Sequence, residues 1–421
     1  MAEMKDSGIE WCGMIPKDWN VMPNKYVMYK KKALCAKYNE EDILSLTMEG
    51  VIVRDLDAGG KMPATFDGYQ IIHPNNLLMC LFDYDVTPRC IGLIKNEGLT
   101  SPAYSQFVLK NGNEAKYYYY YYLMLDNTKE LLHLAKNLRH SFTEDQLGAI
   151  KAPVPPVAVQ KKISEYLDKK CAEIDAIHAD IEKQIETLEE YKKSIITEAV
   201  TKGLNPDAEM KDSGVEWIGN IPFHWKVKKI KYSATLTRGV FGHRPRNDPK
   251  YYDGDYPFIQ TGDVASSNKY IKIFSQTLSE LGKSVSKEFK KGTIALTLAA
   301  NVGDAAILDF DSYFPDSVMA IIPNKNINNV YLYYILSVMK TEFLKVAIIN
   351  TQMNLNVERV GNVYIPITFN ESEQREIVNY LDLKCTEIDG AITDKKQQLE
   401  TLEQYKKSLI YEYVTGKKEV R

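Results

Sequence analysis

The chain of 421 residues carries an internal duplication. The heptapeptide AEMKDSG stands at residues 2–8 and again at 208–214. A second pair of copies lies further along, where YLDKKCAEID at 166–175 returns as YLDLKCTEID at 380–389. The tryptophans of the chain all lie just after the two heptapeptides: Trp11, Trp19, Trp217 and Trp225. A long-period repeat of this kind predicts two structural copies of one unit.

The duplicated pieces enclose two segments that differ between the halves. Segments at about 27–150 and 233–365 share little identity, although the pieces around them are nearly the same. The heptapeptides are offset by 206 residues and the later pair by 214, so the second segment is eight residues longer. This pattern favours one scaffold that carries two different binding domains. Duplication followed by unselective drift is the alternative.

Each half closes with a segment that predicts a long helix. The first covers about 157–202, with two prolines before it and a glycine after it. Its stretch ETLEEYKKSIITEAVT at 186–201 returns as ETLEQYKKSLIYEYVT at 400–415 in the second helix. That helix has Asn370 as its expected N-cap, and Glu373 stands where a capping box places a glutamate.

Both helices carry an apolar seam with a seven-residue period, which is the spacing of a coiled coil. Ile177 and Tyr191 lie three residues after seam positions and are predicted to form a second row. Cys171 and Cys385 lie near the seams, where their small side chains suit packing better than redox chemistry. The seam residues are Leu167, Ile174, Ile181, Leu188 and Ile195, then Leu381, Ile388, Leu402 and Leu409, with Lys395 as an interruption.

The seams predict that the two helices pack on each other. A helix of about 40 residues is roughly 60 Å long, and alone it would leave an apolar stripe in water. Antiparallel packing about a pseudo-twofold axis would place the divergent segments at opposite ends of a rigid spacer. The expected fold is therefore α/β: two mixed α/β domains separated by two long antiparallel coiled-coil helices. The expected boundaries are 1–152, 153–207, 208–366 and 367–421.

Both divergent segments have the pattern of mixed α/β domains. Tyrosines crowd the helical run of the first segment, and they could stack on bases. A helix face packed against a sheet is the favoured interpretation. Both segments close alike, because 138–155 resembles 351–367 in pattern. The expected strands are 76–82, 90–94 and 107–110 in the first segment and 256–264, 292–298 and 305–310 in the second; the expected helices are 116–135 and 330–348.

Local charge separates the two segments. The whole chain has a net charge of -3, so nucleic-acid contacts would have to come from patches. Residues 228–292 contain thirteen Lys and Arg against six Asp and Glu, whereas residues 27–110 contain nine against ten. Arginine can bond guanine bidentately and lysine mostly engages phosphate, so the loop at 238–247 is a candidate DNA reader. A solvated loop could have the same composition. The predicted DNA contacts are Arg238, His243, Arg244, Arg246 and Lys250 in the second segment and Lys30, Lys31, Arg54 and Arg89 in the first.

Motifs of catalysis are missing from the sequence. There is no N-P-P-[FY] run, no G-x-G-x-x-G and no complete phosphate loop, because LGKS at 281–284 lacks the upstream glycine. Acidic residues at 207 and 209 stand too close together for a nuclease metal site. The six cysteines form no C-x-x-C pair, which favours reduced thiols, and the histidines are scattered. No apolar run of about 18 residues and no leader-like start is seen, so a cytoplasmic protein without catalytic residues, metal or cofactor is expected.

Several local patterns together resemble the specificity subunit of type I restriction-modification enzymes. They are SGVEWIGNIPFHW (213–225), PFIQTGDV (257–264), LTSPAYSQF (99–107), TQMNLNVERVGNVYIPI (351–367) and ETLEEYKKSII (186–196). The resemblance covers essentially the whole chain. It implies two target-recognition domains that read the halves of a bipartite double-stranded DNA site, with the helices setting the gap. It also implies two methylase subunits and motor-nuclease subunits as partners, which would hold S-adenosylmethionine, ATP and Mg.

Two other function classes stay open at this point. A coiled-coil adaptor could gather protein partners without DNA specificity, and a stand-alone nuclease of unfamiliar type is a third option. The positive charge at 228–292 favours DNA over the adaptor. Steep weakening of binding with added salt would indicate DNA, because cations released from phosphates drive such binding.

Overall fold

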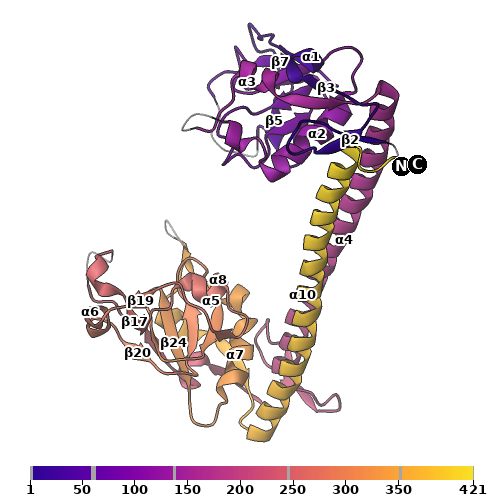
Figure 1. Cartoon of the computed structure of the whole chain (residues 1–421). Coiled ribbons are helices and arrows are strands. Elements are labelled where there is room, and N and C mark those ends of the chain that lie inside the picture. Colours follow the sequence, from indigo (N-terminus) through magenta and orange to yellow (C-terminus); the bar gives the residue numbers. More distant parts are fainter. Residues whose placement is uncertain (1–2, 58–62, 136–138, 244–246, 350–352, 421) are drawn as a thin grey trace. The chain divides into compact units, whose positions relative to one another are not determined.

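The chain folds as two compact units in a computed structural model that describes residues 3–57, 63–135, 139–243, 247–349 and 353–420. One unit comprises residues 1–182 with 396–421, and the other comprises residues 183–395. Helices α4 (Val157–Lys202) and α10 (Glu371–Val414) each contribute to both units (Figure 1). Each unit thus joins one tryptophan motif and one divergent domain to a part of both helices.

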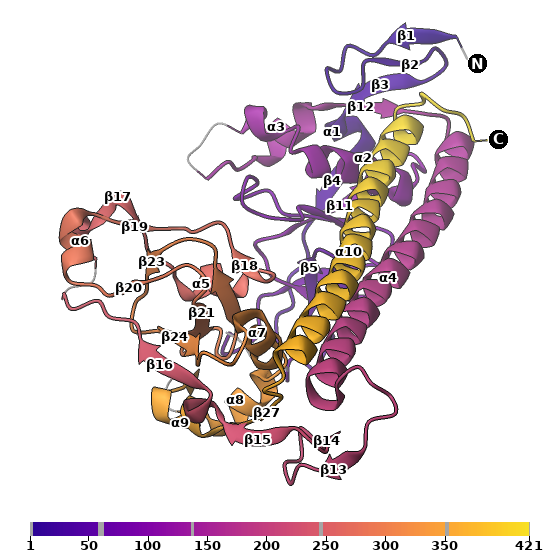
Figure 2. The ribbon, with the colours of Figure 1, turned by 90° about the horizontal axis from the view of Figure 1, so that it is seen from below.

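Within each unit, α4 and α10 pack side by side and run in opposite directions (Figure 2). In the first unit the rings of Tyr166 and Tyr413 lie 4.5 Å apart, and Asp175 pairs with Lys406 at 2.5 Å. Residue numbers therefore rise along α4 as they fall along α10. The antiparallel packing predicted from the seams is confirmed within both units.

The same interhelical ion pair occurs in both units. Lys192 of α4 pairs with Asp389 of α10 at 2.7 Å in the second unit. Asp389 stands 214 residues after Asp175, and Lys406 stands 214 residues after Lys192. The pair in the first unit is therefore the repeat of the pair in the second, with the helices exchanged. Helix α4 thus supplies the aspartate of this pair in the first unit and the lysine in the second.

The apolar seams lie inside the helix pair. Of the predicted seam residues, Leu188 and Leu402 are half-buried and the other seven are at most 9% exposed. The second row was predicted wrongly, because Ile177 and Tyr191 are about half exposed. The inward row instead follows the seam by four residues: Cys171, His178, Ile185, Lys192 and Ala199 in α4. In a heptad the two inward rows are separated by three residues in one direction and four in the other. Packing against the partner helix decides whether the second row follows the seam by three or by four residues.

The helix ends follow the predicted signals with one difference. The Asn370 carboxamide oxygen accepts from the backbone N–H groups of Ser372 and Glu373, as an N-cap does. Glu373 does not complete a capping box, because its carboxylate accepts from the Trp225 indole at 2.9 Å and from the Thr368 hydroxyl. The Glu373 carboxylate therefore accepts from side chains, whereas the sequence pattern predicted that it would accept from the backbone N–H of the N-cap residue.

In the first unit, helix α2 (Ala115–Thr128) packs on an antiparallel four-stranded sheet of order β4-β11-β8-β9. The sheet strands are β4 Met28–Lys31, β11 Ser105–Leu109, β8 Leu77–Met79 and β9 Ile91–Leu93. Two-stranded pairs surround it: β1 Met4–Asp6 with β2 Met14–Pro16, β3 Asn20–Pro23 with β12 Lys151–Val154, β5 Leu44–Thr47 with β6 Gly50–Val53, and β7 Gln70–Ile72 with β10 Gly98–Thr100. The short helices are α1 Asn24–Val27, η1 Leu132–Leu134 and α3 Glu144–Ala149.

In the second unit, the sheet has five strands in the order β16-β24-β21-β22-β18. They are β16 Ala234–Arg238, β24 Val318–Pro323, β21 Ile294–Thr297, β22 Ala305–Leu308 and β18 Tyr270–Ile271, the last parallel to its neighbour. The pairs are β13 Met210–Asp212 with β14 Asn220–Pro222, β15 Lys226–Lys229 with β27 Tyr364–Ile367, β17 Tyr252–Pro257 with β19 Thr277–Leu278, β20 Glu288–Phe289 with β23 Ser312–Tyr313, and β25 Ile348–Ile349 with β26 Met353–Asn354. The short helices are η2 Ile230–Tyr232, η3 Pro249–Tyr251, α5 Thr261–Ala265, α6 Glu280–Ser284, α7 Asn329–Ser337, α8 Lys340–Val346 and α9 Val357–Asn362.

Two predicted elements of the second segment differ from the structure. The strand expected at 256–264 ends at Pro257, and residues 261–265 form helix α5 instead. The Asp263 carboxylate accepts the Gln260 N–H at 2.7 Å and so starts a helical turn. The helix expected at 330–348 is broken into α7 and α8, and the fully buried Met339 lies at the break.

The tyrosine-rich helix α2 is part of the core. Tyr117, Tyr118 and Tyr121 are fully buried, and their hydroxyls donate to backbone carbonyls of α10 or β12. The tyrosines of α7 are buried in the same manner. Burial raises the pKa of these hydroxyls. The interpretation as a packed helix face is confirmed, and these rings are not available for base stacking. Within the described residues, no helix is long and apolar enough to span a membrane.

Candidate nucleic-acid interface

The arginine-containing loop of the second domain starts from a fixed base. Strand β16 ends at the exposed Arg238, whose Nε donates to the Asp316 carbonyl at 2.5 Å. The N–H groups of Gly239 and Gly242 each donate to a carbonyl at 2.9 Å. The stem of the loop is therefore held in place. The predicted contacts Arg244 and Arg246 lie outside the described residues.

His243 and Lys250 share one carboxylate. Asp248 lies 3.7 Å from His243 Nε2 and 2.9 Å from Lys250 Nζ. The hydrogen bond from Lys250 lowers the pKa of the Asp248 carboxyl, so it stays ionised. The His243 ring also stacks on Tyr251 with the centroids 4.0 Å apart. A DNA phosphate approaching Lys250 would have to compete with Asp248.

Ion pairs reduce the positive charge counted in the second segment. Lys250, Lys269, Lys283, Lys290 and Lys291 all lie within 4 Å of a carboxylate. Three of the partner carboxylates come from outside residues 228–292: Asp309, Asp311 and Asp382. The count from the sequence window therefore overstated the local excess.

Exposed lysine and aromatic side chains form a repeated surface that the sequence interpretation missed. Lys231 lies over the ring of Tyr232 at 5.3 Å, and Lys25 lies over Tyr26 at 5.2 Å. Both tyrosines are more than half exposed. The two pairs occupy the same place in the two tryptophan motifs, 206 residues apart. Their recurrence was visible in the sequence, but their exposure was not.

The predicted cations of the first domain are spread over its sheet. Lys30 and Lys31 lie on the edge strand β4, where Lys30 is 3.7 Å from Glu144. Arg89 precedes β9, at the opposite edge of the same sheet. Arg54 is half-buried just after β6. The structure does not gather these four residues into one patch.

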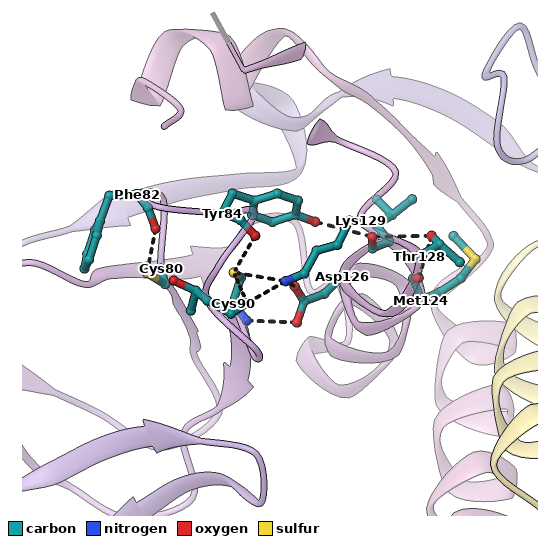
Figure 3. Close-up of polar contacts among 10 residues, drawn as sticks. Cys80, Phe82, Tyr84, Cys90, Met124, Asp126, Thr128 and Lys129 are labelled. Carbon is teal, nitrogen blue, oxygen red and sulfur yellow. Dashed lines mark hydrogen bonds and ion pairs between the residues drawn. The ribbon is translucent and has the colours of Figure 1, made fainter. Parts of the chain in front are cut away.

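The loop before β9, which contains Arg89, is anchored from the protein interior at Cys90 (Figure 3). The buried Asp126 carboxylate accepts from Cys90 N–H at 2.8 Å and pairs with Lys129 at 2.7 Å. Lys129 Nζ also donates to the Thr87 carbonyl at 2.7 Å. These bonds hold the residues on both sides of Arg89, so its side chain starts from a fixed backbone. Cys90 and the other cysteines of the chain are buried free thiols.

A buried glutamine joins each divergent domain to its long helix. Gln160 of α4 accepts from Glu114 N–H at 2.8 Å, just before α2. Gln374 of α10 accepts from Asn328 N–H at 2.7 Å, just before α7. Both carboxamides also donate to nearby carbonyls, and both residues are at most 1% exposed. The two long helices, which we call the frame, thus hold both domains by the same bonds. Sequence identity alone did not reveal these bonds.

The family follows from comparison with known proteins. The sequence profile of the type I restriction modification DNA specificity domain matches residues 91–187 and 222–404. The chain belongs to this family. The two matched stretches include parts of both divergent domains and of both long helices.

Relatives of this specificity-domain chain carry matching names. The putative type I restriction enzyme MjaX specificity subunit of Methanocaldococcus jannaschii is 28% identical over 283 residues, which are 67% of this chain and 62% of that protein. The EcoBI specificity subunit of Escherichia coli is 27% identical over 249 residues, which are 55% of this chain and 50% of that protein. The chain thus matches less than two thirds of the length of either relative.

Solved structures share the fold. A chain from a type I restriction-modification system, solved to explain complex assembly and conformational transition, superposes with a TM-score of 0.70 at 14% identity. The alignment covers 95% of this chain and 98% of that one. The HsdS subunit of Thermoanaerobacter tengcongensis superposes with a TM-score of 0.50 at 14% identity, covering 96% and 98%. The arrangement of two mixed α/β domains with long paired helices is therefore shared by these proteins.

Proposed function

We propose that this chain reads a bipartite double-stranded DNA target, with each divergent domain contacting one half-site. One observation carries the proposal: the two long helices make the same contacts in both units, whereas the two divergent domains differ. Both units keep the same interhelical ion pair and the same buried glutamine bridge. The attached sheets differ in strand number, and the sequence segments that contain them differ in their count of charged residues. One frame with two unlike readers suits a split, asymmetric target.

The chain acts without catalysis of its own in this proposal. Methylase subunits that hold S-adenosylmethionine would modify adenines, and motor-nuclease subunits that hold ATP and Mg would cut. Binding to this chain brings both activities to the target in the cytoplasm. The contacts in the second half-site would include Arg238, Arg244 and Arg246, and those in the first would include Lys30, Lys31, Arg54 and Arg89.

Two copies of the methylase fit the repeated outer surface of the helices. Tyr191 and Tyr405 stand 214 residues apart and are 56% and 54% exposed. The ion pair of Lys170 with Glu173 is likewise repeated by Lys384 with Glu387. Packing between α4 and α10 does not require the exposed residues of the two halves to be identical. A partner that binds each half in the same way does require it.

A methylome tests the proposed function. Cells lacking other adenine methylases would express this chain with its cognate methylase, and a matched strain would express the methylase alone. A new split motif of modified adenines, present only with both proteins, is expected. If methylation is absent although the two proteins associate, the coiled-coil adaptor replaces the DNA reader.

A further inference from the structure

The edge of the second sheet is fastened to both long helices. Asn268 stands two residues before β18 and donates from its carboxamide to Asp389 of α10 at 2.6 Å. Its carboxamide oxygen accepts from Lys192 of α4 at 3.0 Å. Asn268 therefore sits on the interhelical ion pair and contacts both of its members.

Lys269 adds a second contact to the same helices. Its ammonium pairs with Asp382 of α10 at 2.7 Å, and its carbonyl accepts from Ile307 N–H of β22 at 2.8 Å. The Tyr333 hydroxyl of α7 donates to the Asn268 carbonyl at 2.6 Å. The two backbone carbonyls are thus bound to the domain, while the two side chains are bound to the helices. We call Asn268 and Lys269 the brace.

The first unit lacks such a brace among its described residues. Its sheet has four strands, and the repeated ion pair of Asp175 with Lys406 borders a cavity of about 760 Å³. Lys116 and Tyr120 of α2 do reach Asp168, the repeat of Asp382. The first domain therefore contacts this face of the helices from α2, and the cavity lies beside that contact.

We propose that Asn268 and Lys269 are positioning residues that fix the second domain on the helical frame. The inference rests on the proposed bipartite reading of DNA. The brace ties a sheet edge to two helices at once, so it resists rotation of the sheet about its attachment at α7. The tolerance of the complex for an altered gap between half-sites is consequently limited by the brace.

The test uses the full chain with its methylase and plasmids that carry the native split motif with the gap changed by one base pair in either direction. In the Asn268→Ala, Lys269→Ala double variant, methylation at the altered gaps should rise about three- to tenfold relative to the native gap. The half-site sequences should stay unchanged. The single variant Lys269→Arg, with Asn268 unchanged, keeps the ion pair and should show the wild-type gap preference. The exposed Lys272→Ala in the same domain serves as the control and should keep that preference.

Hydrogen exchange at the Ile307 amide gives a readout that needs no DNA. The double variant should exchange faster at this position. Unchanged gap preference in a folded double variant overturns the proposal, whether or not exchange has risen. If thermal melting shows that the double variant is unfolded, Lys269→Gln alone carries the same comparison. A wild-type complex that methylates no split motif would instead overturn the bipartite function, before any variant is compared.

Discussion

Single buried side chains do much of the joining between domain and frame. Gln160 and Gln374 are buried polar residues in helices α4 and α10. The other buried positions of these helices are mostly apolar, and their charged residues are mostly exposed. Each satisfies one backbone donor and two acceptor groups that would otherwise be buried without partners. Such groups cost more when left unpaired than a typical hydrogen bond contributes.

Replacing Gln374 by alanine should lower the free energy of unfolding by about 2–3 kcal/mol, because Asn328 N–H and two carbonyls lose their partner. Chemical denaturation followed by tryptophan fluorescence measures the change. Gln398→Ala is the matched control, since Gln398 is exposed on the same helix and should change stability by less than about 0.5 kcal/mol. Equal effects of the two variants would contradict the bridging role.

The arginines of the 238–247 loop make a prediction for DNA reading. Replacement of Arg244 or Arg246 by alanine should relax sequence preference in one half-site only, at about 1–3 kcal/mol for each lost base contact. Methylation of target libraries randomised in each half-site measures this preference. Equal weakening of both half-sites would mean that the loop contacts phosphates without reading bases.

At the scale of elements, one interhelical ion pair recurs in both units. Asp175–Lys406 fixes the register of α4 against α10 in the first unit, and Lys192–Asp389 fixes it in the second. Charged residues in an inward row of a coiled coil specify register, even where they add little stability. Helix length is therefore free to change only by whole heptads, and in both helices together.

Deletion of residues 182–188 together with 396–402 removes one heptad from each helix and keeps the seams in phase. The helices shorten by about 10 Å, so the gap in the methylated motif should shrink by about three base pairs while both half-sites persist. A methylome of cells with the shortened chain measures the gap. Deleting only 182–185 and 396–399 breaks the heptad phase and should abolish methylation. An unchanged gap after the heptad deletion would show that the helices do not set it.

The repeated outer tyrosines predict how many methylase subunits bind. Tyr191→Ala and Tyr405→Ala should each reduce the bound methylase from two copies to one, because each removes an exposed aromatic contact from one half. Native mass spectrometry counts the copies. Ile177→Ala is the control, since Ile177 is 49% exposed and its repeat position is already Ala391. Two copies on both tyrosine variants would place the docking surface elsewhere.

At the scale of the whole molecule, a slightly negative chain is expected to bind a polyanion through local contacts. The structure pairs many of the counted lysines with carboxylates, so few phosphate contacts are expected from any one surface. Contacts from both domains would then have to add up along one duplex.

Specific duplex binding by the chain with its methylase should weaken steeply between 50 and 200 mM salt, by about a thousandfold for about six phosphate contacts. Fluorescence anisotropy with target and scrambled duplexes measures this dependence. Assembly of the chain with the methylase through the helix surfaces should change far less over the same range. A flat salt response of duplex binding would favour the adaptor.

Much of the frame could be predicted from the sequence, because its signals are local. The bounds of α4 agree with the predicted 157–202, and the seam residues are inside the helix pair. The second row with Ile177 and Tyr191, the strand at 256–264 and the capping role of Glu373 were wrong. The second row and the Glu373 contact depend on partners distant in sequence. The strand was wrong because the Asp263 carboxylate starts a helical turn.

The sequence by itself determined that one frame occurs twice and that each copy ends in a long amphipathic helix, because identity and seven-residue periodicity are written along the chain. Only the tertiary structure decided which charges remain to meet DNA, since Asp309, Asp311 and Asp382 reach lysines from outside the basic segment. It also decided that the second domain is braced against the helices through Asn268, because that contact joins residues more than 70 positions apart along the chain.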